Sequence, residues 1–201
     1  MTGIRSRRLA AFVHPVIVAA IIAAAGHAQT QSGQGSSSGW HHFGQDKPAS
    51  AADRLAATER EMYELINRDR AANRAPTGQP LLPLRWNDQV AAAARAHSRD
   101  MVLHGYFGHV DPEGRSPGMR LKGAGIAWQA AGENIAIDTT VKSAEYAFMN
   151  EAGGEQNHRS NILSPKFTDV GVGIATGPGG QLYITQDFMR PAASLQGSFP
   201  R

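Results

Sequence analysis

Four short segments of this 201-residue chain bring histidines and carboxylates into polar, glycine- or asparagine-rich surroundings. Imidazole is the commonest metal ligand in proteins and the usual acid or base near neutral pH. Two histidines that converge on carboxylates can hold Zn²⁺ with a water molecule, or relay protons. The segments are Phe107-Gly108-His109 with Asp111-Pro112-Glu113-Gly114, Gly132-Glu133-Asn134-Ile135, Phe148-Met149-Asn150-Glu151, and Asn157-His158-Arg159 with Asn161-Ile162-Leu163.

The spacing of these segments does not by itself define a site. They lie too far apart in the sequence for a local metal motif, so the fold must bring them together. Taken alone, a histidine in such a segment is more often structural than catalytic or metal-binding.

Glu133 is the most informative of these residues. In a regular strand that begins there, its side chain shares a face with Ile135 and Ile137. A carboxylate on an apolar face costs roughly several kcal/mol unless it is paired or protonated. We therefore expect a nearby imidazole as its partner. The preceding Gly132 leaves a second possibility open, in which the backbone turns the carboxylate outward.

Several classes of chemistry are excluded by what the sequence lacks. There are no cysteines, which removes a disulfide scaffold, a thiolate zinc finger and a cysteine nucleophile. There is no P-loop, no H-E-x-x-H and no G-x-S-x-G. The glycines of Val170-Gly171-Val172-Gly173 lie inside a predicted strand and open no helix, so they do not form a dinucleotide-binding fingerprint.

The elements that must position these residues form an α+β pattern, with helices first and a strand-rich part last. Residues 74–85 contain three prolines and are expected to form a loop. His97 falls on the apolar stripe of the second helix, so we expect a hydrogen-bonded core histidine there. Helices are predicted from the N-cap Ser50 to about Ala71, from the N-cap Asn87 to about His104 with Gly105 as the stop, briefly after Ser116-Pro117, and from the N-cap Thr140 past Phe148. Strands are predicted over Glu133 to Ile137, Val170 to Ile174 and Leu182 to Phe188, the last two joined by the turn Gly177-Pro178-Gly179-Gly180.

The N-terminal segment points to export. Arg5, Arg7 and Arg8 precede an apolar run from about Leu9 to Ala25, which is the layout of a secretory signal. Cleavage is expected after Ala28, with Ala25 as a second position, and an uncleaved N-terminal anchor is the alternative. We divide the chain into a signal peptide (1–28), a flexible Gly/Ser/Gln-rich linker (29–50), a globular domain (51–191) and a C-terminal tail (192–201).

Net charge argues against nucleic acid as a partner. The chain has 20 Lys and Arg, and removing the three Arg of the signal leaves 17 against 17 Asp and Glu. A mature chain with no net charge is not expected to bind phosphate backbones. The histidines at 41 and 42 are expected to be solvated residues of the linker.

The candidate segments, taken in order, resemble the signature of the CAP superfamily (cysteine-rich secretory, antigen 5 and pathogenesis-related 1 proteins). The resemblance is to its bacterial, cysteine-free branch with an SCP domain, and it covers about residues 55–190. The matching elements are Gly132-Glu133-Asn134-Ile135, Asn157-His158-Arg159-x-Asn161-Ile162-Leu163, Val170-Gly171-Val172-Gly173 and Tyr183-Ile184-Thr185-Gln186-Asp187-Phe188, with Glu61-Met62 to Asn67, Arg70, Leu84 and Trp86-Asn87 in the opening part.

This resemblance implies a three-layer α-β-α sandwich with a largely antiparallel sheet and a cleft that holds two histidines and two acids. Carried over by motif, the cleft residues are His109, Glu133, Glu151 and His158. Glu151 fits less well because Phe148 stands where the family has Trp, and Glu155 is the alternative.

Two functions follow as expectations. The first is a non-catalytic, monomeric, extracytoplasmic binding module, secreted or held at the cell envelope, with Zn²⁺ on His109 and His158 and a groove for a lipid or glycan-like ligand. The alternative is a metal-dependent cell-envelope hydrolase with Glu133 or Glu151 as general base. The absence of catalytic motifs favours the first.

Overall fold

The computed structural model describes residues 49–151 and 157–193. The signal peptide, nearly all of the linker, Glu155 and most of the C-terminal tail therefore lie outside the described residues. The elements follow one another as α1 (Ala51–Ala72), β1 (Arg85–Trp86), α2 (Asp88–His104), α3 (Pro117–Gly123), β2 (Trp128–Asp138), α4 (Val141–Asn150), α5 (His158–Ile162), β3 (Asp169–Thr176), the 3₁₀ turn η1 (Pro178–Gly180) and β4 (Leu182–Pro191).

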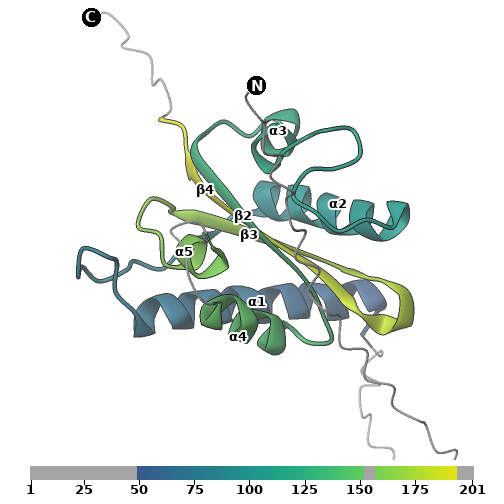
Figure 1. The fold of residues 1–201 in the computed structure, drawn as a ribbon, viewed down its shortest axis with the longest axis horizontal. Helices are drawn as coiled ribbons and strands as arrows, with labels where there is room; N and C mark the ends of the chain where they lie inside the picture. Colours follow the sequence, from purple (N-terminus) through teal and green to yellow (C-terminus); the bar gives the residue numbers. More distant parts are fainter. Residues whose placement is uncertain (1–48, 152–156, 194–201) are drawn as a thin grey trace, which may run out of the picture. The chain divides into compact units, whose positions relative to one another are not determined.

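The described strands form one mixed sheet between two layers of helices. The strand order is β1-β3-β4-β2, with β1 parallel to β3 and the other pairs antiparallel. Helix α2 packs on β3 and β4, and α1 packs on β3. Figure 1 shows α1 and α4 on one side of the sheet, and α2 and α3 on the other. This arrangement confirms the expected α+β, three-layer architecture.

The helix ends follow from local side-chain chemistry. Ser50 and Asp53 form a capping box at the start of α1, which satisfies backbone donors that have no partner inside the helix. Asn87 accepts from the Val90 N–H at the start of α2, and Gly105 ends that helix at φ +66°. Both boundaries agree with the sequence prediction.

The larger apolar core lies between the sheet and the α1–α4 layer. It is built from the apolar stripes predicted for these helices and from alternate residues of the closing hairpin. Because each stripe supplies every third or fourth residue, one face of each helix is removed from water. The fully or nearly fully buried members include Met62, Leu65, Ile66, Val141, Ala144, Phe148, Val170, Val172, Ile174, Ile184 and Phe188.

The glycines of β3 allow α2 to approach the opposite face of the sheet. A Cβ at Gly171 would lie 2.1 Å from the Ala91 nitrogen, and one at Gly173 would lie 2.0 Å from the Arg95 nitrogen. A side chain at either position would therefore force the helix away from the strand. Close packing of α2, and not cofactor binding, explains the V-G-V-G pattern.

Two local predictions need correction, and one element was not predicted. Strand β2 is much longer than the predicted 133–137 segment because its first residues pair with the end of β4. The segment predicted as loop ends in the short strand β1, which pairs with β3. The region of His158 is a helix, α5, because Asn157 and Ser160 form a capping box.

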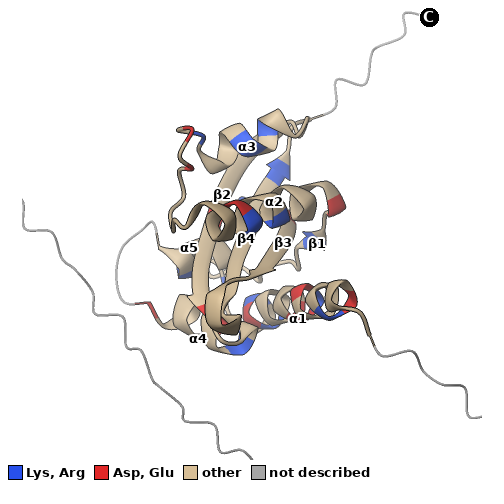
Figure 2. Cartoon of the chain, turned by 90° about the vertical axis from the view of Figure 1, so that its right-hand side faces the viewer, with Lys and Arg blue, Asp and Glu red and all other residues tan. Residues whose placement is uncertain are grey.

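The surface of the described part carries both signs of charge. Figure 2 shows basic and acidic residues next to one another along α1. No helix in the described ranges is long and apolar enough to cross a bilayer.

Candidate functional site

Glu133 lies on β2, directly opposite Asp187 of β4, and its carboxylate points toward the α2–α3 side of the sheet. Its side chain is only 1% exposed. His109, in the loop after α2, contacts this carboxylate with Nδ1 at 2.8 Å from Oε1. The expected imidazole–carboxylate contact is therefore present, and the carboxylate is turned inward.

Arg120 of α3 is a second partner of Glu133. Its Nη2 donates to Glu133 Oε2, while its Nη1 donates to the His109 carbonyl at 2.8 Å and to the Arg115 carbonyl at 2.9 Å. The arginine thus ties the histidine loop to the buried carboxylate. A buried carboxylate that meets a guanidinium and an imidazole is compensated in both charge and hydrogen bonding.

His97 of α2 is a third neighbour of the Glu133 carboxylate. It is 1% exposed, its Nε2 lies 3.1 Å from the Gly108 carbonyl, and the same nitrogen is 3.8 Å from Glu133 Oε2. Burial lowers the pKa of His97, partly offset by the Glu133 charge. The predicted core histidine is thus found, with the added role of holding the loop before His109.

Asp187 brings a second carboxyl group against Glu133. It is 1% exposed, and its Oδ1 has no hydrogen-bond partner among the described residues. Burial and the neighbouring Glu133 charge raise the pKa of Asp187 well above its usual range, which favours the protonated acid. Two facing carboxyl groups therefore sit behind His109, and protonation of Asp187 relieves their repulsion.

The second histidine stands at the junction of α4 and α5. Glu151 follows α4, and its Oε2 lies 2.9 Å from His158 Nδ1 and 3.0 Å from the His158 backbone nitrogen. Phe148 contacts the same imidazole, with ring centroids 4.7 Å apart. Burial lowers the pKa of His158; Glu151 partly offsets this, and the charge of His109 lowers it further.

The four residues proposed from the sequence thus form two imidazole–carboxylate pairs. The two histidines lie close enough for the charge of one to affect the other. In the described ranges, no three of the four bring ligand atoms within 4.8 Å of one another. The pairs are neighbours, and no closed metal cage is formed. Glu151 contacts His158, and Glu155 lies outside the described residues.

Comparison with known proteins identifies the family. The model for CAP, the cysteine-rich secretory protein family, matches residues 63–188. The chain belongs to this family. Protein YkwD of Bacillus subtilis (strain 168), described as uncharacterized, is 39% identical over 125 residues, which are 62% of this chain and 45% of YkwD.

A solved structure agrees with this assignment. An extracellular protein containing a SCP domain from Bacillus anthracis superimposes with a TM-score of 0.60 and 30% identity over 72% of this chain and 45% of that chain. The membrane protein YlbC of B. subtilis (strain 168), also described as uncharacterized, is 33% identical over 55% of this chain and 30% of its own length. The chain spans less than half the length of each of these relatives. They support a CAP domain of bacterial type.

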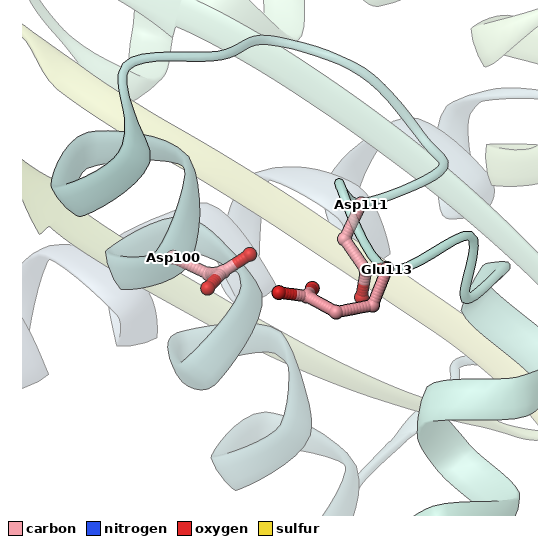
Figure 3. Close-up of side chains that lie close together, drawn as sticks. All are labelled: Asp100, Asp111 and Glu113. Atoms are coloured by element: carbon pink, nitrogen blue, oxygen red, sulfur yellow. The ribbon is translucent and has the colours of Figure 1, made fainter.

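One further polar group of the CAP domain could hold a cation. Asp100, Asp111 and Glu113 bring carboxylate oxygens within 4.8 Å of one another (Figure 3). Arg115 already contacts Asp111 at 2.8 Å and Glu113 at 3.1 Å. This guanidinium neutralises part of the charge, so the group is internally compensated.

A pocket adjoins Glu133 between α3 and the first half of β2. Its volume is about 360 Å³. Trp128 and Met119, which are 39% and 56% exposed, form an apolar part of its wall. The full lining is Ser116, Pro117, Gly118, Met119, Lys122, Trp128, Ala131, Gly132 and Glu133.

Two residues that surround the Glu133 carboxylate, Asp187 and Arg120, were not predicted as site residues from the sequence. Asp187 carried a signal, because an acid alternates with Thr185 and Met189 on one face of a strand whose central residues, Ile184 to Met189, are all buried. Arg120 carried none, since a basic residue on a short helix is usually solvated. Its role depends on α3 lying across β2.

Proposed function

We propose that this chain is an exported CAP-domain binding module that holds a divalent metal through His109 and His158. One observation carries the proposal: each imidazole uses Nδ1 to contact a carboxylate, at 2.8 Å for His109 and 2.9 Å for His158. A carboxylate on one ring nitrogen fixes the tautomer and orientation, and the other nitrogen is left to ligate a metal. No hydrogen bond to either Nε2 is found within residues 49–151 and 157–193.

The donor set fits zinc. Zn²⁺ accepts imidazole nitrogen, and its remaining positions can be taken by water. The lowered pKa of His158 supports this reading, because a ligand histidine must be neutral. Bound zinc would supply a Lewis-acidic centre, held on the protein side by two imidazoles whose carboxylate partners fix them.

Binding is favoured over hydrolysis by the state of Glu133. A general base must be free to take a proton from water. Glu133 already meets Arg120 and His109, and its side chain is almost fully buried. Glu151 is 40% exposed and is the better placed of the two acids for a hydrolase. The hydrolase therefore stays the second candidate, with Glu151 as its base.

The pocket beside Glu133 is our candidate for the organic ligand. Its volume of about 360 Å³ falls in the range of small-molecule sites, and Trp128 and Met119 offer apolar contact area. A lipid or glycan-like ligand, as the family resemblance implies, would place its apolar face on these side chains.

We propose that the protein acts outside the cytoplasm as a monomer and without nucleic acid. The predicted signal in residues 1–28 and the likeness to a Bacillus anthracis protein described as extracellular support export. Mixed charges on α1 (Figure 2) agree with the exclusion of phosphate backbones.

Zinc titration by calorimetry tests the metal site. We expect His109→Ala and His158→Ala each to weaken binding at least about tenfold, or about 1.4 kcal/mol. His104→Ala is the matched control, because this exposed histidine pairs with Asp100 outside the site. A double alanine variant of His41 and His42 checks that the linker does not bind the ion. Equal affinity in all variants would reject the metal site.

The hydrolase candidate needs its own assay. Zinc-loaded protein is tested on a panel of peptide, ester and glycan substrates. Turnover that disappears in Glu151→Gln would replace the binding function with the hydrolase. An inactive wild type across the panel leaves the binding module as the proposal.

A further inference from the structure

A chain of buried side-chain amides crosses the interior on the α4–α5 side of the sheet. Gln186 of β4 donates its Nε2 to Glu145 Oε2 at 2.7 Å. Asn134 of β2 donates its Nδ2 to Gln186 Oε1 at 2.9 Å. Asn161 of α5 donates its Nδ2 to Asn134 Oδ1, also at 2.9 Å. The chain therefore joins α4, β4, β2 and α5.

The amide chain also contacts the backbone of the candidate site. Asn134 also donates its Nδ2 to the His158 carbonyl at 3.1 Å. Asn161 also donates its Nδ2 to the Glu133 carbonyl at 3.1 Å. Each of the two imidazole–carboxylate pairs thus has one member whose backbone is held by the amide chain.

Glu145 sets the orientation of the Gln186 amide at the α4 end of the amide chain, whereas the His158 and Glu133 carbonyls orient Asn134 and Asn161. Each amide donates with its NH₂ and accepts with its oxygen, so Gln186 presents its oxygen to Asn134 while its NH₂ faces Glu145. An acceptor at Glu145 Oε2 turns the Gln186 NH₂ toward α4 and leaves its oxygen for Asn134. Without that acceptor, the Gln186 amide has less reason to hold this orientation.

The second carboxyl oxygen of Glu145, Oε1, faces a neighbouring acid on α1. Glu145 is 1% exposed, and its Oε1 has no hydrogen-bond partner among the described residues. Asp69 of α1 faces it, with Arg68 nearby, and burial raises the pKa of Glu145 to about 8. A proton on Oε1 can be donated toward Asp69, which pairs both groups and leaves Oε2 free to accept.

We propose that Glu145 is a positioning residue, which fixes the backbone of Glu133 and His158 through the Gln186–Asn134–Asn161 amide chain. It touches neither histidine side chain and acts through the amides alone. Its functional importance rests on the metal-binding role proposed above, whereas its structural effect does not. No motif of the sequence analysis included this residue.

Three full-length variants at pH 6.5 test the proposal. Glu145→Gln keeps an oxygen for Gln186 and an NH₂ for Asp69, so it should preserve the chain. Glu145→Leu has similar volume and no acceptor, so it should release the Gln186 amide. Val141→Ala is the matched control, because Val141 is buried on the same helix but outside the chain.

The readouts are hydrogen exchange of the α5 amides, NMR signals of the three side-chain NH₂ groups, and zinc affinity. In Glu145→Leu we expect the NH₂ signals to shift, and α5 protection and zinc affinity to fall about two- to tenfold, as for one lost hydrogen bond. Glu145→Gln and Val141→Ala should keep the wild-type NH₂ signals and stay within about twofold in the other two readouts.

Two results overturn the inference. One is a Glu145→Leu variant whose NH₂ signals and α5 protection match those of Val141→Ala. The other is a Glu145→Gln variant whose NH₂ signals, α5 protection and zinc affinity change as much as those of Glu145→Leu. If Glu145→Leu changes the NH₂ signals and α5 while wild type itself binds no zinc, the positioning role stands and the proposed metal function falls.

Discussion

The two imidazole–carboxylate pairs look alike in distance but differ in what surrounds the carboxylate. In the first pair Glu133 is 1% exposed and His109 is 48% exposed, so the acid is interior and the ring faces solvent. In the second pair Glu151 is 40% exposed and His158 is 30% exposed. The first carboxylate belongs to the sheet, whereas the second only follows the end of a helix.

This difference indicates how each pair depends on the fold. Glu133 has an arginine, two histidines and a second carboxyl group around it, so a change there disturbs several buried partners. Among the described residues, Glu151 contacts one imidazole and one backbone N–H. Partly exposed ion pairs contribute little to stability, and loss of one partner from a buried pair is costly. The stability of the fold should therefore depend strongly on the first pair, whereas substitutions in the second pair should change it little.

The largest effect is expected for Glu133→Gln. The substitution leaves the Arg120 guanidinium buried without its counter-charge, which should cost about 3–5 kcal/mol of unfolding free energy. Urea denaturation followed by circular dichroism measures it. A loss below about 1 kcal/mol would show that the first pair is no more integral than an exposed one.

A pH dependence of similar size is expected from Glu145, a buried acid without a direct cationic partner. Its pKa is raised from 4.5 to about 8, so the unfolded chain releases this proton first. Stability should then fall as pH rises from about 4.5 to about 8, by up to about 1.4 kcal/mol per pH unit from this one group. Denaturation across this range should show a smaller decline in Glu145→Gln. Parallel curves for both proteins would contradict the raised pKa.

A small effect is expected for Glu151→Gln. The lost contact is partly exposed, and the amide oxygen can still accept from the His158 backbone nitrogen, so the cost should be about 0–1 kcal/mol. The same urea experiment measures it beside Glu133→Gln. Equal losses in the two variants would remove the distinction between the pairs.

The smallest effect concerns the titration of His158 in metal-free protein. Burial holds the pKa of His158 below 6.5, and Glu151 counteracts this. Stability from this group is therefore present above about pH 6.5 and is lost as pH falls through the lowered pKa. NMR titration should show a midpoint below 6.5 that drops further in Glu151→Gln. An upward shift in that variant would contradict the assigned partner.

The sequence predicted the parts of this structure that depend on local pattern. Ser50 and Asn87 located helix starts, and alternation in the closing hairpin located β3 and β4, because caps and periodicity act over a few residues. A charge on an apolar face favoured a paired, inward Glu133, but Gly132 left an outward carboxylate open until the structure was known. Arg120 and Asp187 could not be assigned in the same way, since their partners come from elements distant in the sequence.

Anomalous diffraction at the zinc edge, from crystals soaked in zinc, tests whether the two histidines bind one metal ion. We predict one strong peak bonded to Nε2 of His109 and Nε2 of His158, with Glu133 and Glu151 still on the opposite ring nitrogens. A peak held instead by Asp100, Asp111 and Glu113, or no protein-bound zinc at all, would contradict it.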